Sequence, residues 1–293
     1  MGDQAGTALG ALARADRLRG AIPAPLRRFL RGLLPWEAYE RQTWAAHDPC
    51  PGAPDVSDYE GRVAVTLGVV DGYGYLWRSY LCACRDLGVP YRVVDITGTD
   101  WLDRVREADC AGFLVWPCPV LSSWKEMTDE RIMIMVEELG AAVYPSYREL
   151  WLYESKTRVQ YWLEANGVPH PKTWIFTSHL DAAAFARTAS LPVVFKTDLG
   201  SSAAGVRVVE SRRALRRLVD RSFGSGVVRK GGHRGDRHWG SVILQEYVEG
   251  AKEWRAIRLG RSYFAHRKLA RGQFHSGSGR VSFGNDRIDS RTL

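Results

Sequence analysis

The sequence predicts an α/β protein of more than one domain, with a parallel β-sheet in its first half. Apolar runs of strand length alternate with helical stretches between residues 62 and 145, which is the pattern of βαβ units. The chain has 293 residues, more than one ordinary hydrophobic core takes up, so two or three domains are expected. Hydrophobic residues make up 45% and charged residues 25%, as in globular proteins.

The predicted elements of the first half follow one another with short connections. We expect strands over 62–70, 91–96, 111–117 and 141–145, and helices over 75–87, 99–108 and 127–139. The turn DGYGYLW (71–77) contains only G-x-G, so the full fingerprint of a dinucleotide-binding turn is absent. A glycine-rich turn of this kind lets the backbone pass close to a ligand or a neighbouring segment.

The second half predicts a mixture of helices and strands. A helix is expected over 147–166, where Gly167 ends it, and another over 178–189 with Ser178 as its N-cap. The remaining predicted elements are strands at 193–196 and 206–209, a basic helix at 211–223, a strand in SVILQEYVEG (241–250) and a hairpin that turns at Gly260–Arg261.

The first 58 residues are rich in Ala, Arg and Pro and precede the first predicted strand. Residues 24–39 predict a short basic amphipathic helix, which either contacts a membrane surface or a partner, or packs on the body of the protein. We favour packing on the body. Residues 47–58 predict a linker, because they are rich in Pro, Gly and Asp.

Cysteine usage and hydropathy favour a cytoplasmic protein. No apolar run approaches the ~18–20 residues that span a bilayer, and the first residues lack the apolar core of a signal peptide. The five cysteines are odd in number and none shows C-x-x-C spacing. We therefore expect neither a disulfide framework nor a zinc site, and a reducing compartment fits best.

The formal net charge of +8 and the sequence pI of about 9.3 suit nucleic acid, an anionic surface or acidic small molecules. Nucleic acid is a minor hypothesis, because zinc-finger, RNP-like and helix-turn-helix patterns are absent. The basic helix has two interpretations, a solvated face or a landing surface for an acidic acceptor, and we favour the solvated face. Its arginines are Arg212, Arg213, Arg216, Arg217 and Arg221.

Two lysines interrupt apolar patterns about forty positions apart. Lys156 lies in the stripe of the predicted helix 147–166, and Lys196 lies within the strand at 193–196. Both positions are expensive for an ammonium group unless it is paired or reaches solvent. The loop GSSAAG (200–205) follows Lys196, and its small residues let backbone N–H groups approach an anion. A polyphosphate fits this set, although the loop is not a Walker P-loop.

The stretch ILQEYVEG places Gln245 and Glu246 in an apolar strand, where unsatisfied polar groups would cost about 1–3 kcal/mol each. An adenine ring supplies the hydrogen bonds that such a segment needs. Glu253 follows within reach of ribose hydroxyls, and Arg255 lies two residues later on the same strand face, where it would stabilise charge on a phosphoryl group.

These motifs in this order resemble the ATP-grasp superfamily, and more closely its RimK-like and glutathione-synthetase-like branch. The resemblance covers about residues 60–290 and rests on the helix lysine, GVPHPKTW, PVVFKTDLGSSAAGVRVV and ILQEYVEGAKEWRAIRLG. It implies a Rossmann-like pre-ATP-grasp domain followed by an ATP-grasp domain with an incomplete C-terminal subdomain. The expected ranges are 1–58 for the extension and linker, 59–146 for the first domain, and 147–240 and 241–293 for the two ATP-grasp subdomains.

The resemblance also implies roles for single residues. Lys156 and Lys196 would bind phosphates, and the loop with Ser201, Ser202 and Ala203 would cover them. The remaining implied contacts are adenine with Gln245, Glu246, Tyr247 and Val248, ribose with Glu253, and the phosphoryl or carboxylate end with Arg255 and one of Arg267 or Lys268. Residues 274–280 resemble the second glycine-rich loop of the family.

The implied activity is ATP-dependent ligation of a carboxylate to an amine through an acyl phosphate. The alternative is a non-catalytic ATP-binding regulatory or assembly protein. The family uses Mg²⁺, but the sequence ends at Leu293 before its usual ligands, and Asp286 and Asp289 do not replace them. A truncated ligase, a partner chain that completes the site, and a degenerate nucleotide binder all remain open, and the family often forms dimers or tetramers.

Overall fold

The structure is a computed structural model that describes residues 48–59, 65–117, 120–230, 232–270 and 279–283. The chain divides into two compact units, Met1–Leu150 and Trp151–Leu293. We describe each unit by itself. The four domain ranges expected from the sequence stay predictions.

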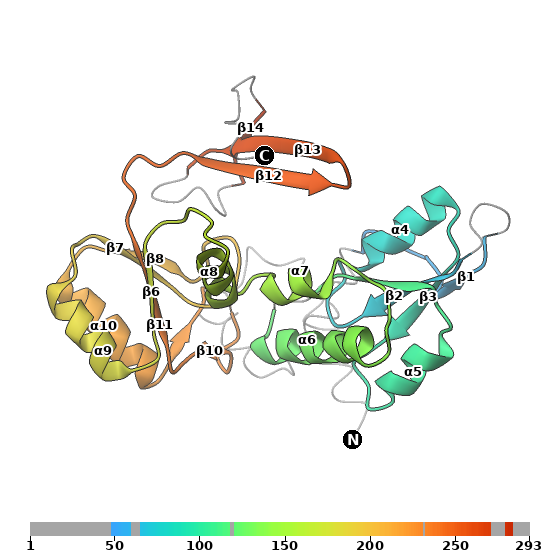
Figure 1. The fold of residues 1–293 in the computed structure, drawn as a ribbon, viewed down its shortest axis with the longest axis horizontal. Coiled ribbons are helices and arrows are strands. Elements are labelled where there is room, and N and C mark those ends of the chain that lie inside the picture. The colour runs from blue at the N-terminus through green and yellow to red at the C-terminus, as the bar shows by residue number, and fades with distance from the viewer. Residues whose placement is uncertain (1–47, 60–64, 118–119, 231, 271–278, 284–293) are drawn as a thin grey trace, which may run out of the picture. The chain divides into compact units, whose positions relative to one another are not determined.

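The first unit is built on a five-stranded sheet with the strand order β1-β3-β2-β4-β5 (Figure 1). Strands β2 to β5 run parallel, and only β1 is antiparallel to its neighbour. The elements are β1 (Val56–Ser57), β2 (Leu67–Asp71), α4 (Arg78–Leu87), β3 (Tyr91–Asp95), α5 (Trp101–Glu107), β4 (Gly112–Val115), α6 (Ser122–Glu137), β5 (Val143–Tyr144) and α7 (Tyr147–Leu152). The predicted alternation of strands and helices around a parallel sheet is confirmed.

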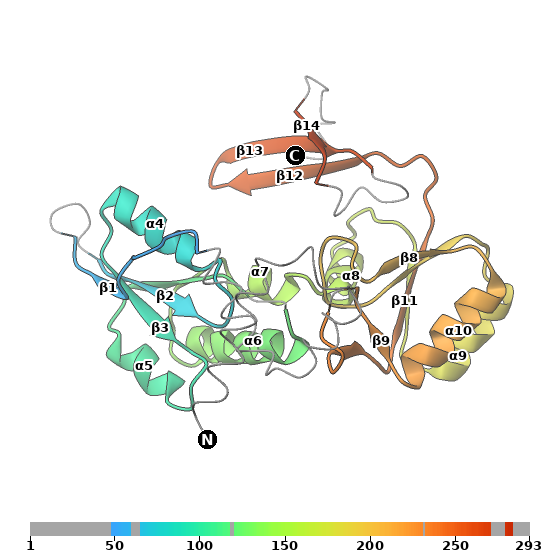
Figure 2. The ribbon, with the colours of Figure 1, turned by 180° about the vertical axis from the view of Figure 1, so that it is seen from behind.

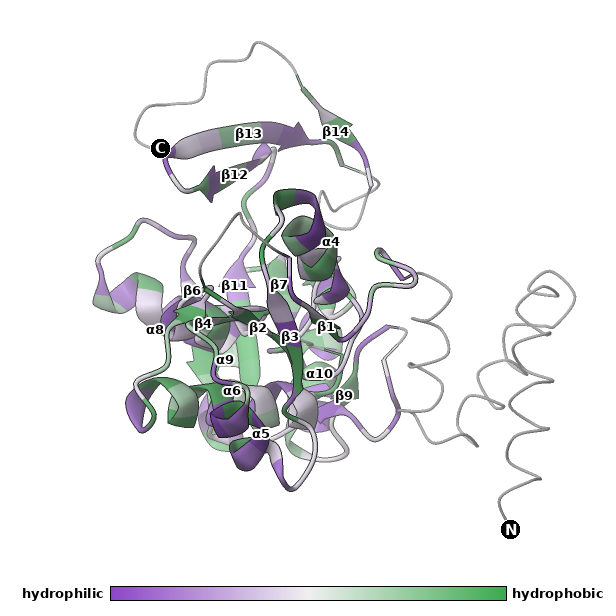
Figure 3. Ribbon diagram, turned by 90° about the vertical axis from the view of Figure 1, so that its right-hand side faces the viewer, coloured by the Kyte–Doolittle hydropathy of each residue, from purple (hydrophilic) through white to green (hydrophobic). Residues whose placement is uncertain are grey.

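Helices cover both faces of this sheet, as the crossover connections of parallel strands require. Helix α4 packs Leu81 and Cys84 against Val69 and Tyr91 on one face. Helix α5 contributes Val105, and helix α6 contributes Ile132 and Met135, to a second cluster on the opposite face. The hydropathy colouring shows that α4 carries both hydrophobic (green) and hydrophilic (purple) residues (Figure 3).

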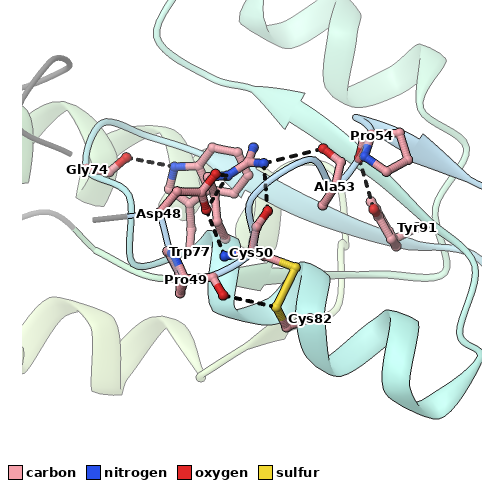
Figure 4. A network of polar contacts seen from close by, with 10 residues as sticks. Asp48, Pro49, Cys50, Ala53, Pro54, Gly74, Trp77, Cys82 and Tyr91 are labelled. Carbon is pink, nitrogen blue, oxygen red and sulfur yellow. Dashed lines mark hydrogen bonds and ion pairs between the residues drawn. A yellow bond between two sulfur atoms is a disulfide. The ribbon is translucent and has the colours of Figure 1, made fainter. Parts of the chain in front are cut away.

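The segment before β2 is part of the folded unit, so our linker interpretation of residues 47–58 is wrong for its described residues. Asp48 accepts hydrogen bonds from Nε of Arg78 at 2.9 Å, and the Arg78 guanidinium also donates to the carbonyl oxygens of Cys50 and Ala53 (Figure 4). The Tyr91 hydroxyl donates to the carbonyl of Pro54 at 2.9 Å. These contacts fix the segment along the edge of the sheet, where β1 pairs with β3.

The same segment is joined to α4 by a disulfide between Cys50 and Cys82, with 5.6 Å between their Cα atoms (Figure 4). The expectation that the cysteines form no disulfide is corrected at this pair. Motif spacing could not reveal it, because the two cysteines are 32 positions apart and meet only when the segment lies on α4. Cys84 and Cys110 are free thiols. The bond removes the cysteine argument for a reducing compartment, and the cytoplasmic location stays a prediction.

The second unit contains a four-stranded antiparallel sheet with the strand order β6-β11-β7-β8. Helices α9 and α10 lie side by side against it (Figures 1 and 2). The elements are α8 (Lys156–Ala165), β6 (Thr173–Phe176), α9 (His179–Thr188), β7 (Val193–Lys196), β8 (Val206–Val209), α10 (Arg212–Phe223), β9 (Val227–Val228), β10 (Arg237–His238) and β11 (Val242–Glu246). The structure confirms the two predicted strands at 193–196 and 206–209 and the two predicted helices at 178–189 and 211–223. It also confirms the Ser178 cap, whose side chain accepts a hydrogen bond from the Asp181 amide.

The single helix expected over 147–166 is wrong, because the chain forms α7 and α8 with a break between them. Glu154 adopts a left-handed backbone conformation with φ of 62°, which a continuing helix does not allow. Ser155 then caps α8, since its side chain accepts a hydrogen bond from the amide of Arg158. Lys156 is thus the first residue of a helix, rather than an interruption in the middle of a longer one.

A second sheet in this unit consists of β12 (Glu253–Leu259), β13 (Ser262–Lys268) and β14 (Val281–Ser282). Strands β12 and β13 form the predicted hairpin, and the turn at Gly260–Arg261 is confirmed by the pairing of Leu259 with Ser262. The predicted helix at 24–39, residues 274–278 of the second glycine-rich loop, and both Asp286 and Asp289 lie outside the described residues. In the ranges that the structure describes, no helix has the length and apolar character needed to cross a membrane.

Candidate functional site

The sheet of the second unit has one face that α9 and α10 cover and one face that carries polar groups. Phe195 and Leu244 are fully buried in the cluster formed with the two helices. Because side chains alternate along a strand, Lys196 and Gln245 project from the other face. Thr173 of β6 lies on this same face, because it pairs directly with Gln245. Strand β6 is the neighbour of β11 on the side away from β7. Three polar side chains from three strands therefore share the face that the helices leave uncovered.

These three side chains form a hydrogen-bonded row. Nζ of Lys196 donates to Oε1 of Gln245 at 2.7 Å, and Nε2 of Gln245 donates to Oγ1 of Thr173 at 2.8 Å. Burial lowers the pKa of Lys196, and the nearby carboxylate of Glu253 opposes that shift. The ammonium is thus poorly solvated, and a neutral amide oxygen is its hydrogen-bond acceptor. Such a group favours an anionic partner.

Lys156 lies at the start of α8 and reaches the loop that follows β7. Its Nζ donates to the carbonyl oxygens of Asp198 at 2.9 Å and Gly200 at 2.7 Å. Burial lowers its pKa to about 8, although the carboxylates of Glu154 and Asp198 oppose the shift. Both sequence-predicted lysines are therefore partly withdrawn from water, and each makes hydrogen bonds to neutral oxygens.

Asp198 connects the loop to the start of α8. Its Oδ1 accepts from the amide of Thr157 at 2.7 Å and from Oγ of Ser155 at 3.1 Å. Its carbonyl oxygen accepts from Nζ of Lys156, as described above. A carboxylate at this position satisfies an orphan amide and interacts favourably with the helix dipole. Asp198 thereby fixes the position of Lys156 relative to the loop.

His238 on β10 contacts the same aspartate from the other side. The backbone amide of Asp198 donates to Nδ1 of His238 at 3.3 Å, and Oγ of Ser241 lies 3.4 Å from Nε2. A backbone amide can only donate, so Nδ1 is the acceptor and the neutral ring carries its proton on Nε2. Burial lowers the pKa of His238, which favours this neutral form.

The loop between β7 and β8 presents backbone amides rather than side chains. Ser202 and Ala203 have φ values of 54° and 59°, in the left-handed region. In the described part of the chain, the amides of Ser201, Ser202 and Ala203 donate to no protein acceptor. Successive N–H groups in a turn of this kind form a concave binding site for an anion. A Cβ atom at Gly205 would lie 1.8 Å from Oγ1 of Thr197, so this position requires glycine.

Further charged groups lie near Lys156, and of these only Arg255 was predicted from the sequence. Burial raises the pKa of Glu154, and the positive charges of Lys156, Arg229 and Arg255 oppose that shift. Arg229 forms an ion pair with Asp236 at 2.6 Å, and both side chains are largely buried. Glu154 was hard to predict as a site residue, because only the capping residue Ser155 indicates in the sequence that a helix begins after it.

The hairpin separates the residues that the sequence placed at the phosphoryl end. Glu253 pairs with Lys268 across the ladder, and their side chains form an ion pair. Arg255 shares this face, because it lies two residues after Glu253. Arg267 pairs with Trp254, so it lies on the opposite face of the hairpin from Arg255 and Lys268. Of the two alternatives, Lys268 is the one that shares a face with Arg255.

The expected adenine segment continues from the end of β11. The Glu246 amide donates to the carbonyl of Lys172 at 2.9 Å, and a carboxylate oxygen of Glu246 accepts from the Lys172 amide at 2.7 Å. These bonds join the end of β11 to the residue before β6. Tyr247 and Val248 follow with 37% and 49% of their surface exposed, so the chain leaves the sheet with apolar side chains in contact with solvent.

The family resemblance implies a bound Mg²⁺, but no residue of this chain was predicted to be its ligand. Among the described residues, no group of three or more His, Cys, Asp or Glu side chains could hold a metal ion. We therefore assign no magnesium ligand and derive no chemical step through the ion.

Comparisons with known proteins find likeness only at the level of structure. No family model matches the chain, and no curated protein matches it. The solved structures that resemble it include N5-carboxyaminoimidazole synthetase from Staphylococcus aureus in complex with ADP, with a TM-score of 0.51, 13% identity and 74% of this chain covered. The chain spans 58% of the length of that enzyme.

Two further structures show weaker likeness. A RimK domain protein ATP-grasp from Sphaerobacter thermophilus has a TM-score of 0.47 and 15% identity, and the match covers 70% of this chain and 73% of that one. D-alanine–D-alanine ligase from Bacillus anthracis has a TM-score of 0.43 and 17% identity, with 66% and 61% covered. At 13% identity, the likeness to the Staphylococcus aureus structure shows the fold alone.

Proposed function

Because the chain has the fold of the ATP-grasp enzymes, we propose that it binds ATP on the face of the β6-β11-β7-β8 sheet that carries Lys196 and Gln245, and acts as an ATP-dependent carboxylate–amine ligase. One observation carries the proposal. Lys156 donates to carbonyl oxygens of the loop that follows Lys196, both lysines are partly buried, and the successive loop amides at Ser201, Ser202 and Ala203 have no acceptor among the described residues. Together they provide two cations and a backbone site for the phosphate groups.

The two lysines would bind phosphate oxygens by exchanging their present acceptors. Lys156 now donates to two carbonyl oxygens and Lys196 to an amide oxygen. A phosphate oxygen is a stronger acceptor for an ammonium than either, since charge-assisted hydrogen bonds are about twice as strong as neutral ones. Binding would also restore full charge to Lys156, whose pKa burial lowers to about 8.

The rest of the nucleotide would lie along the end of β11. Gln245 is fixed by Thr173 and Lys196, and the backbone of Glu246 and Val248 follows with Tyr247 between them. Glu253 would bind ribose hydroxyls, for which it must leave or share its ion pair with Lys268. These assignments follow the family resemblance and are supported by the position of the segment at the edge of the polar face.

The ligase reaction would use the cations on one face of the β12–β13 hairpin. Arg255 and Lys268 share that face and would stabilise charge on the phosphoryl or carboxylate group. The named activity of the Staphylococcus aureus structure, a synthetase with bound ADP, agrees with this reaction class. The carboxylate, the amine acceptor and a homo-oligomeric state are proposed as classes only. Mg²⁺ is expected with the nucleotide, because it neutralises phosphate charge in phosphoryl transfer.

A regulatory or assembly protein that binds ATP without turnover is the second candidate. The likeness to a synthetase structure does not favour it. The two candidates are distinguished by ADP release in the presence of ATP and Mg²⁺. A ligase releases ADP only when a carboxylate and an amine are both supplied, whereas a binder releases none with any pair of substrates.

The experiment is a coupled ADP assay on a panel of amino acids and short peptides, run with the wild type and with Arg255→Ala. Turnover that requires both substrates and falls at least about tenfold in the variant supports the ligase. ATP binding without turnover across the panel favours the regulatory protein. Lack of ATP binding in the wild type overturns both.

A further inference from the structure

Helix α10 presents four arginines on its solvent-exposed side. Leu215, Leu218, Val219 and Ser222 are buried against the rest of the unit, which leaves the opposite side of the helix to solvent. The exposed side carries Arg213, Arg216, Arg217 and Arg221, which we call the arginine face. These positions are spaced i, i+3, i+4 and i+8, so the four guanidinium groups extend over about 12 Å of one helix side.

The arginine face has no carboxylate partner in the ranges that the structure describes. The neighbouring basic and acidic residues are already engaged. Nη1 of Arg212 donates to the carbonyl oxygens of Arg187 and Ala189 at the end of α9, at 2.7 and 3.1 Å. Asp220 contacts Nε2 of His179 at 3.0 Å. Asp220 lies among the four arginines, four positions after Arg216 and three after Arg217, but no ion pair joins it to them in the described residues.

An exposed tryptophan lies beside the C-terminal end of the arginine face. Trp239 is 66% exposed, and its indole N–H donates to the carbonyl of Gly224 at 2.9 Å. Arg237 is held at the same turn, because its Nη1 donates to the carbonyl of Ser225 at 2.8 Å. Gly224 and Ser225 directly follow α10. The structure therefore orients an aromatic ring and a further guanidinium toward solvent at this point.

Leu180 is 79% exposed near the same end of α10. The preceding residue, His179, packs its ring on Phe223 with 5.5 Å between centroids. This contact places the start of α9 beside the end of α10. The surface therefore combines unpaired arginines with a fixed tryptophan and an exposed leucine.

We propose that the arginine face, Trp239 and Leu180 form a docking surface for an acidic protein segment. Arginine and tryptophan are the residue types most enriched among energetically dominant interface positions. The guanidinium fork matches the geometry of carboxylates, and a row at helical spacing matches glutamates at i and i+4 of a partner helix. Leu180 and the Trp239 ring supply apolar contacts that a polypeptide can use.

Nucleic acid fits this surface less well. Single-stranded nucleic acid uses several aromatic rings on which successive bases stack, whereas one fixed ring lies here. Asp181 and Asp220 also lie on the exposed sides of α9 and α10. A continuous phosphate backbone would be repelled at these carboxylates, but a peptide of mixed sequence can place a neutral or basic residue there. The proposal is independent of the nucleotide site.

The test measures fluorescence anisotropy of two labelled probes with the full chain at low salt. One probe is a glutamate-rich helical peptide with interspersed alanine and leucine, and the other is an oligothymidylate of equal charge. The variants are Arg213→Gln with Arg217→Gln, and Trp239→Ala. A matched control removes two exposed arginines of the first unit, Arg106→Gln with Arg148→Gln. All substituted side chains are exposed, so circular dichroism and melting should be unchanged.

We expect the peptide to bind and both surface variants to weaken it about tenfold, with the control within about twofold. Equal losses in the surface and control variants would show that only net charge matters, and would overturn the proposal. Tighter binding of oligothymidylate, lost in the same variants, would assign the surface to nucleic acid instead. No peptide binding up to about 1 mM would also overturn it.

Discussion

The backbone amide of Asp198 donates to Nδ1 of His238 across 3.3 Å, while the carboxylate of the same aspartate caps the helix that begins with Lys156. Through these bonds the loop after β7, the start of α8 and strand β10 are held together at one residue. The position of the Lys156 ammonium therefore depends on Asp198.

Replacing Asp198 should lower both stability and nucleotide affinity. Asp198→Ala removes the acceptor for the Thr157 amide, and loss of a capping acceptor costs about 1 kcal/mol. Urea unfolding measures this loss. Asp198→Asn keeps an acceptor oxygen at the same place, so it should recover most of the affinity that the alanine variant loses. Equal affinity in wild type and Asp198→Ala would contradict a positioning role.

The affinity for ATP should fall as the pH rises above about 8. Lys156 loses its proton there in the free protein, because burial lowers its pKa to about 8, and phosphate binding requires the charged form. The decline should approach tenfold per pH unit if the bound lysine stays protonated. Titration calorimetry at several pH values between about 7 and about 9.5, a range that brackets this pKa, measures the decline in affinity.

Lys156→Arg is the control for this pH dependence, because arginine stays charged throughout and the profile should become flat. The sign for folding is the opposite of that for binding. Between about 8 and 10.5 the unfolded chain binds more protons at this position than the folded protein. The free protein should therefore gain stability as the pH rises through that range. If ATP affinity depends on pH in the same way in the wild type and in Lys156→Arg, the assignment of Lys156 to the nucleotide site is wrong.

The folded protein should lose stability as the pH falls below 6.5. Burial lowers the pKa of His238 below the ordinary value of 6.5, so the unfolded chain takes up a proton before the folded protein does. The stabilisation is complete above 6.5 and disappears as the pH approaches the folded pKa. Thermal melting from pH 7 down to 5 measures it, and His238→Gln should lack this contribution. If the melting temperature falls equally with pH in the wild type and in His238→Gln, His238 is not the group responsible.

Reduction should destabilise the first unit. The Cys50–Cys82 disulfide closes a loop of 32 positions, and the chain-entropy relation assigns such a loop about 3.7 kcal/mol. Melting with and without dithiothreitol measures the effect. Cys82→Ser should melt at the temperature of the reduced wild type and should be insensitive to the reductant. Cys110→Ser is the matched control, because Cys110 is a free thiol and its variant should keep the sensitivity.

The sequence predicted those features that depend on one strand or helix at a time. A lysine within an apolar strand was enough to single out Lys196, and composition alone predicted both strands around the loop. Helical periodicity continued from α7 into α8, so it concealed the break at Glu154 that places Lys156 at a helix start. Local pattern therefore located the lysines but not the geometry that holds them.

The residues that sequence reasoning missed act through contacts between distant segments. Asp198 meets Ser155 from 43 positions away and His238 from 40 positions away, and neither spacing belongs to a recognisable motif. Cys50 and Cys82 meet for the same reason, after the segment at 48–57 folds along the sheet. Burial, which lowers the pKa values of both lysines, also becomes visible only when the chain is folded.

The most direct measurement is ATP binding by calorimetry to wild type, Lys196→Met and Lys172→Met. Lys172 is the matched control, because its ammonium lies over the Trp174 ring, which belongs to the helix-covered side of the same sheet. The account predicts that Lys196→Met loses at least about tenfold in affinity, while Lys172→Met stays within about twofold of wild type. Equal binding by Lys196→Met and wild type would contradict the assignment of the nucleotide site to the sheet face that carries Lys196 and Gln245.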